Sequence, residues 1–156
     1  MFDQSVRVLL VGADGDAYVL ACEALDSIAG GDYVLDSAPT PTEGLVQAQA
    51  GDYDLIVACY APDSATCSEF RLSALAAGCS TPIICLAHGD DTAASRHAFQ
   101  AGVREYLVRD RTDSSSLGRS MRYALEVERL SRALEQAHAR EAELGRKSQR
   151  SLLDGT

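Results

Sequence analysis

The chain has 156 residues, of which 46% are hydrophobic and 24% charged, the composition of one ordinary globular domain with a short appendage. The net charge is −9, but residues 1–117 carry 6 basic and 17 acidic side chains, whereas residues 118–156 carry 8 and 6. An acidic body argues against binding to nucleic acid, and no run reaches the roughly 18–20 apolar residues of a membrane span, so we expect a cytoplasmic protein that binds neither nucleic acid nor membrane.

Five short apolar runs alternate along the chain with segments of helical character. The runs cover residues 6–11, 33–38, 55–59, 82–87 and 105–108. The first four are followed by predicted helices at about residues 18–28, 40–50, 68–77 and 92–101, the first of them with Asp16 as its expected N-cap. The fifth run leads through a polar turn into the last and longest helix.

The central runs are almost entirely apolar, which indicates strands of a parallel sheet with helices on both faces. The run at residues 33–38 is only half apolar, as expected near a sheet edge. We therefore predict an α/β protein with a doubly wound, five-stranded parallel sheet and an extended C-terminal helix. In such sheets the functional crevice lies beyond the carboxyl ends of the strands, here in the loops after residues 11, 59, 87 and 108.

The last helix is predicted to run from residue 114 to about 147. Its apolar or small residues alternate at spacings of four and three, interrupted at Glu141, which is the pattern of a coiled-coil seam. The seam consists of Tyr123, Val127, Leu130, Leu134, Ala137 and Leu144. Leu117, Met121 and Leu125 are expected to pack on the sheet instead. We predict a domain at 1–127, a coiled-coil extension at 128–147 that forms a homodimer of parallel or antiparallel helices, and a flexible tail at 148–156.

Several strings resemble the receiver domain of two-component response regulators over residues 6–127. They are the stretches 52–57 and 82–86, the string Ala-Gly-Val-Arg-Glu-Tyr-Leu-Val at 101–108, and the entry into the last helix at 117–126. The resemblance implies a flavodoxin-like sheet with strand order 2-1-3-4-5. It also implies that the chain is the N-terminal regulatory part of a longer protein, with an output domain or a protein partner. In the family, partners commonly bind the face formed by the fourth helix and fifth strand.

Receivers accept a phosphoryl group on an aspartate at the end of the third strand, with a cation held by an acidic pair after the first strand. A Thr or Ser after the fourth strand and a Lys after the fifth bind the phosphoryl oxygens. The corresponding positions in this chain are Gly12 and Ala13 for the acidic pair (with Asp14 one residue late), Cys59 for the acceptor, Ala87 for the hydroxyl and Arg109 for the lysine. The resemblance therefore implies a degenerate receiver that is not an enzyme and needs no metal or cofactor.

The five cysteines are odd in number and form no C-x-x-C pair, so reduced thiols are expected, with neither disulfides nor a zinc site. Cys59 is the exception that admits a sharper hypothesis. A neighbouring Arg109 would lower the pKa of its thiol and suit it to redox sensing, although a strand-end residue that fills space is the simpler interpretation.

Two further alternatives concern ligands of the crevice. Asp14 and Asp63 could hold a weakly bound cation, or both could be ordinary turn residues. Gly12 and Gly15 would allow a nucleotide phosphate to approach the backbone, with Asp36 on the ribose, but the glycine pattern lacks its third member. His88 is interpreted as a loop histidine, because no second ligand stands at metal-binding spacing.

Overall fold

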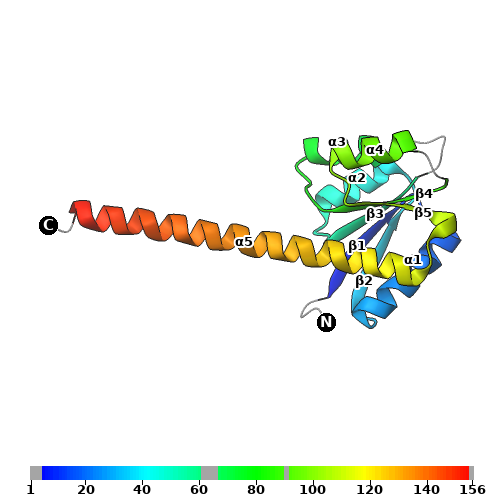
Figure 1. The fold of residues 1–156 in the computed structure, drawn as a ribbon, viewed down its shortest axis with the longest axis horizontal. Helices are drawn as coiled ribbons and strands as arrows, with labels where there is room; N and C mark the ends of the chain where they lie inside the picture. Colours follow the sequence, from blue (N-terminus) through cyan, green and yellow to red (C-terminus); the bar gives the residue numbers. More distant parts are fainter. Residues whose placement is uncertain (1–4, 61–66, 90–91, 155–156) are drawn as a thin grey trace. The chain divides into compact units, whose positions relative to one another are not determined.

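The computed structural model describes residues 5–60, 67–89 and 92–154, and their side chains apart from those of Tyr60 and residues 148–154. The strands are β1 (Val6–Val11), β2 (Tyr33–Ala38), β3 (Leu55–Tyr60), β4 (Ile83–Ala87) and β5 (Glu105–Val108). The helices are α1 (Gly15–Ala29), α2 (Pro41–Ala50), α3 (Cys67–Ala76), α4 (Thr92–Ala101) and α5 (Ser114–Asp154), with a 3-10 turn at Arg109–Arg111. Strands and helices alternate in the predicted order (Figure 1).

The strands form one parallel sheet in the order β2-β1-β3-β4-β5. The predicted fold class and strand order are confirmed, and so is the edge position of the half-apolar strand β2. The register aligns Val11 with Ala58, Cys59 with Leu86, and Ala87 with Val108. Because these residues end their strands together, the loops that follow them meet at one edge of the sheet.

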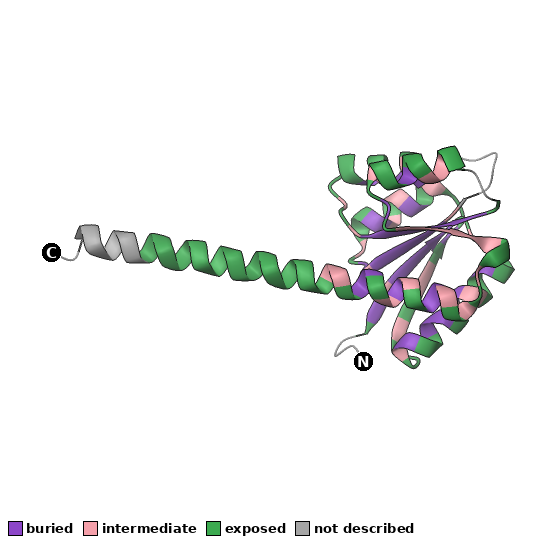
Figure 2. Ribbon diagram, viewed as in Figure 1, coloured by how far each residue is buried: buried purple, intermediate pink, exposed green. Residues whose placement is uncertain are grey.

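Successive strand residues enter two separate apolar cores, one on each face of the sheet. On one face, Leu10, Val57 and Leu86 pack against α1 and the first part of α5, which contributes Leu117, Met121, Ala124 and Leu125. On the other face, Leu9, Ile56 and Cys85 pack against residues of α2, α3 and α4. Both layers are visible in Figure 1, and Figure 2 shows the buried central strands between them. Leu117, Met121 and Leu125 thus lie in the core, as predicted.

The helix ends correct two expectations. The N-cap of α1 is Asp14, whose carboxylate accepts a hydrogen bond from the Ala17 amide at 2.9 Å, so the helix begins earlier than the predicted cap at Asp16 allows. The helix α5 continues to Asp154, past the expected end near residue 147, and Gly145 lies inside it. Thr40 is the N-cap of α2, and its hydroxyl oxygen accepts a hydrogen bond from the Glu43 amide at 3.2 Å.

The chain divides into two units, residues 1–125 and residues 126–156. The first contains the sheet, its covering helices and the start of α5. In the second, residues 129–147 are all exposed and two ion pairs link side chains four residues apart, Glu128 with Arg132 and Glu143 with Lys147. Within the described residues, no helix is both long and apolar enough to cross a lipid bilayer.

Candidate functional site

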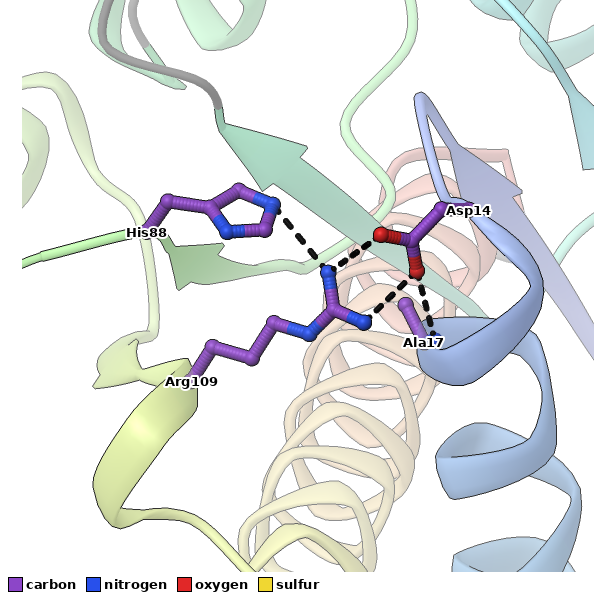
Figure 3. A network of polar contacts seen from close by, with 4 residues as sticks. All are labelled: Asp14, Ala17, His88 and Arg109. Atoms are coloured by element: carbon purple, nitrogen blue, oxygen red, sulfur yellow. Dashed lines mark hydrogen bonds and ion pairs between the residues drawn. The ribbon is translucent and has the colours of Figure 1, made fainter.

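The carboxyl edge of the sheet brings three charged or polar side chains together from distant parts of the sequence (Figure 3). Asp14 lies at the start of α1, His88 follows β4, and Arg109 follows β5. The guanidinium of Arg109 donates two hydrogen bonds to the carboxylate of Asp14, from Nη2 to Oδ1 at 2.6 Å and from Nη1 to Oδ2 at 2.9 Å. This fork-to-carboxylate geometry is the strong form of an ion pair.

His88 completes the network from the other side of Arg109. Its Nε2 lies 3.1 Å from Nη1 of Arg109. A guanidinium can only donate, so a hydrogen bond between these two atoms has Nε2 as its acceptor. The histidine that the sequence presents as an ordinary loop residue therefore helps to orient Arg109.

The Asp14 carboxylate has a local and a long-range function. One of its oxygens caps α1 through the Ala17 amide, and both oxygens accept from Arg109, 95 residues away. The hydrogen bonds from Arg109, followed by that from Ala17, hold the pKa of Asp14 well below its ordinary value of 3.8. Asp14 does bond to the local backbone, as expected of a turn residue. Its ion pair with Arg109 was not predicted.

Gly12, at the first acidic position of the resemblance, has a left-handed backbone with φ of 72°. A Cβ atom there would approach the carbonyl oxygen of Cys59 to 3.0 Å. A side chain at residue 12 therefore faces both backbone strain and a close contact with β3. The loop is shaped for glycine, and a carboxylate cannot simply be restored at this position.

Cys59 occupies the acceptor position at the end of β3, and its side chain packs against the core cluster on the α1 and α5 face. Burial raises the pKa of its thiol to about 12; Arg109 opposes this shift, and Asp14 adds to it. Arg109 does act to lower the pKa of the Cys59 thiol, as the hypothesis expects, but the net shift is upward. Desolvation exceeds the attraction of a cation whose charge is already paired with Asp14.

The donors at this edge do not fit the cation that the resemblance associates with phosphoryl transfer. Gly12 and Ala13 have no carboxylate, Ala87 has no hydroxyl and is fully buried, and both oxygens of Asp14 are engaged by Arg109. Across residues 5–60, 67–89 and 92–154, no three His, Cys, Asp or Glu side chains gather closely enough to hold a metal ion. Asp63, the second candidate ligand, lies outside the described residues, as does most of the loop after Cys59.

Solved structures with a similar arrangement of strands and helices include response regulator receiver domains. A CheY-like response regulator receiver domain from Methanospirillum hungatei superposes with a TM-score of 0.68 at 19% identity, covering 82% of this chain and 99% of that chain. The chemotaxis response regulator CheY4 of Vibrio cholerae gives a TM-score of 0.64 at 19% identity, with coverage of 78% and 99%. This chain has the receiver-domain fold. Neither a protein-family model nor a curated protein matches the sequence itself.

A third structure similar to this receiver fold is a fusion protein that carries a trimeric coiled coil of yeast Spc42. It superposes with a TM-score of 0.68 at 16% identity and covers 92% of this chain and 95% of that chain. Its match is longer than those of the two response regulators.

The predicted seam residues of α5 differ in exposure from the core residues of the same helix. Tyr123 and Leu130 are each 68% exposed, Leu134 is 58% exposed and Leu144 is 65% exposed. Ala137 is also exposed, and Val127 is half-buried. The stripe is therefore largely uncovered within a single chain.

Asp36, proposed as a ribose ligand, does not serve the crevice of the receiver fold. Its carboxylate accepts a hydrogen bond from the Tyr53 hydroxyl at 2.7 Å, and Tyr53 lies at the amino end of β3. Asp54 is occupied at the same end, where its carboxylate accepts from the Arg7 amide at 2.8 Å. Both acidic groups stabilise the edge of the sheet opposite the crevice.

Two cysteines of the receiver fold form a bond that the sequence analysis missed. Cys67 at the start of α3 and Cys85 in β4 are joined by a disulfide, with their Cα atoms 6.1 Å apart. The expectation that all five cysteines are free thiols is wrong for these two, since the fold places α3 directly over the β4 residue. The alternation of side chains in β4 puts Cys85 on the α3 face, which is the one signal that could have suggested the pair.

Proposed function

We propose that this chain is a receiver-like signalling domain that does not accept a phosphoryl group and acts by binding protein, as the regulatory part of a larger protein. The observation that carries this proposal is the forked ion pair between Arg109 and Asp14, beside a half-buried Cys59 whose thiol is protonated near neutral pH. The guanidinium of Arg109 is already paired with a carboxylate of the same chain. Arg109, the cation that would attract a phosphoryl group at this position, is thus already paired, and no carboxylate stands at residue 59 to receive the group.

The chemistry of the thiol supports the absence of phosphotransfer and of a thiol-based enzyme activity. A nucleophilic cysteine needs to be a thiolate, and a thiol whose pKa is raised to about 12 is almost wholly protonated near neutral pH. The nucleotide-binding alternative loses its support as well, because Asp36 is engaged by Tyr53 and the Gly12 loop lies against β3. We therefore place signalling in surface contacts.

The phosphorylation part of the proposal is tested with the intact chain and a small phospho-donor such as acetyl phosphate, in the presence of magnesium. Mass spectrometry should show no added phosphoryl group on the wild type, nor on Cys59→Asp, because the acidic pair and the hydroxyl are still missing from Cys59→Asp. A receiver with an intact acidic site serves as the positive control. A stable single phosphoryl adduct on the wild-type chain would overturn the proposal.

The second part of the proposal is a homodimer formed through the seam Tyr123, Val127, Leu130, Leu134, Ala137 and Leu144. A helical segment with little tertiary contact is marginal in water, and a row of exposed leucines is stabilised by a partner helix with the same row. The similarity to a fusion protein with a coiled coil is consistent with such an extension. A dimer would give the output part of a longer protein a defined pairing.

The dimer is tested by light scattering after size-exclusion chromatography of the full chain. Leu130→Glu and Leu134→Glu each place a charge in the seam and should convert a dimer into a monomer. The matched control is Ala139→Glu, which adds the same charge at an exposed position of the same helix outside the seam. A wild-type chain that remains monomeric at high micromolar concentration would show that the seam does not pair.

A further inference from the structure

The disulfide between Cys67 and Cys85 lies in the core on the α2, α3 and α4 face of the sheet. Cys67 is the first residue of α3, Cys85 is in the middle of β4, and both are buried. The bond closes a segment of 18 residues and fixes the first turn of α3 to the sheet. Among the described residues, the free cysteines are Cys22, Cys59 and Cys79.

The pair is separated from Cys59 by the sheet itself. In the register of β3 and β4, Ala58 lies beside Cys85 and Cys59 beside Leu86. Neighbouring residues of a strand face opposite sides, and Cys59 accordingly packs in the other core cluster. Cys67 and Cys85 are thus partners for each other, and the crevice thiol is not placed to exchange with them.

We propose that Cys67 and Cys85 form a reversible thiol–disulfide site that clamps the start of α3 to β4 when oxidised and releases it when reduced. This site is independent of the degenerate phosphorylation positions. Its oxidant is a low-molecular-weight disulfide of the glutathione type. Its natural entry point is Cys67, because terminal turns of helices open more readily than the centre of a sheet.

The exchange occurs in two steps. The thiolate of Cys67 attacks one sulfur of glutathione disulfide, forms a mixed disulfide and releases one glutathione thiolate. The thiolate of Cys85 then attacks the Cys67 sulfur and releases the second glutathione. The two cysteines lose two protons and two electrons in total, and glutathione disulfide is reduced to two glutathione molecules.

The position of the clamp gives the reaction a structural consequence. The helix α3 lies beside α4 on the outer layer of the molecule, so the order of its first turn affects a surface formed by both helices (Figure 1). Cys85 also precedes Ala87 and His88 in the chain, and His88 contacts Arg109. The redox state of the pair would therefore affect the conformation of the α3 and α4 surface and of the loop that follows β4.

The test uses the full chain, reduced with dithiothreitol, desalted and then treated with glutathione disulfide. Intact mass should fall by two hydrogens, and peptide mapping should link Cys67 to Cys85. The melting temperature should rise by about 5–10 °C, the order expected from cross-linking a segment of this length. Amide hydrogen exchange in the first turn of α3 should slow on oxidation and recover when dithiothreitol is added again.

Matched variants separate this site from the other thiols. Cys67→Ala and Cys85→Ala should show neither the mass change nor the rise in melting temperature, whereas Cys59→Ala should respond like the wild type. Cys67→Ala carries the test if the buried Cys85→Ala variant fails to fold. The proposal is overturned if the wild type stays a dithiol, if the bond forms without changing melting temperature or exchange, or if dithiothreitol cannot reduce it in the native protein.

Discussion

Arg109 keeps the positive charge expected after the fifth strand of a receiver, but its partner is inside the chain. Its side chain is only 14% exposed, whereas that of Asp14 is 58% exposed, so one half of the pair is sheltered and the other faces water. Both hydrogen bonds to Asp14 are well formed, and His88 holds the guanidinium from a second direction. The positive charge of Arg109 is therefore neutralised by a carboxylate of the same chain.

The pair has a definite signature in the pH dependence of stability. The pKa of Asp14 is lowered in the folded state, so its charged form stabilises the fold above its ordinary value of 3.8, and this contribution is lost as the pH falls through the lower native pKa. Asp14→Asn keeps the helix cap but removes the charge. We expect the variant to unfold at a lower urea concentration than the wild type at pH 7, and the difference to shrink as the pH falls below about 4.

The control for that measurement is the double variant with Arg109→Gln. If the ion pair is the source of the difference, Asp14→Asn should cost little in a chain that already lacks the Arg109 charge. An undiminished effect in the double variant would show that the loss does not come from the ion pair with Arg109.

The helix α2 shows how closely one element can be fitted to another. A Cβ atom on Gly44 would come within 2.8 Å and 2.9 Å of the two Cγ atoms of Val11, a buried residue of β1. Valine is branched at Cβ and has little freedom to turn away. Gly118 plays the same part in α5, where a Cβ would meet Ser27 Oγ at 3.1 Å and the Ala24 carbonyl oxygen at 3.3 Å of α1. These two glycines set the distance of their helices from the elements beneath them.

Two glycine-to-alanine substitutions in helices should therefore have opposite signs. Gly44→Ala should lower the free energy of unfolding by about 1–3 kcal/mol, because the overpacking at Val11 exceeds the gain in helix propensity. Gly145→Ala has nothing within 4 Å of the new Cβ and should increase helicity, a gain of up to about 1 kcal/mol for the helix. Urea unfolding checks the first, and circular dichroism the second. A stabilised Gly44→Ala would mean that α2 can move away from β1 at little cost.

The whole molecule consists of a sheet domain and a helical unit with different sources of stability. Residues 1–125 have two buried cores, while residues 129–147 of the second unit have only exposed side chains. The first unit is stabilised by burial of apolar surface within one chain. The second has helix propensity and pairs such as Glu143 with Lys147, which contribute only a few tenths of a kcal/mol each.

Helix content should consequently depend on protein concentration. If the second unit is stabilised by pairing, dilution from high to low micromolar should reduce the helical circular dichroism signal. At every concentration, Leu134→Glu should give the lower helical circular dichroism signal that the wild type gives when dilute. A helical signal that does not change with concentration in the wild type would argue against stabilisation by pairing.

The sequence by itself determined the order of the elements, the parallel sheet and the edge at which the carboxyl ends of its strands meet. Apolar runs of strand length and helical periodicity are local properties, and they are sufficient to predict a doubly wound sheet. Motif positions predicted a degenerate site at Gly12, Cys59, Ala87 and Arg109, and the residues Cys59 and Ala87 do lie near the ends of neighbouring strands. The burial of Leu117 and Met121 and the exposure of Leu130 agree with the sequence, which assigned the first two to the core and the third to the seam.

Only the tertiary structure decided which of these residues interact. The Asp14–Arg109 pair spans 95 residues, and the Cys67–Cys85 bond joins a helix start to a strand, so neither has a local pattern. The pKa of Cys59 depended on whether burial or the charge of Arg109 was stronger, which motif position cannot tell. Local periodicity fixes where a side chain lies along its element, whereas pairing and protonation depend on distances that exist only once the elements have packed.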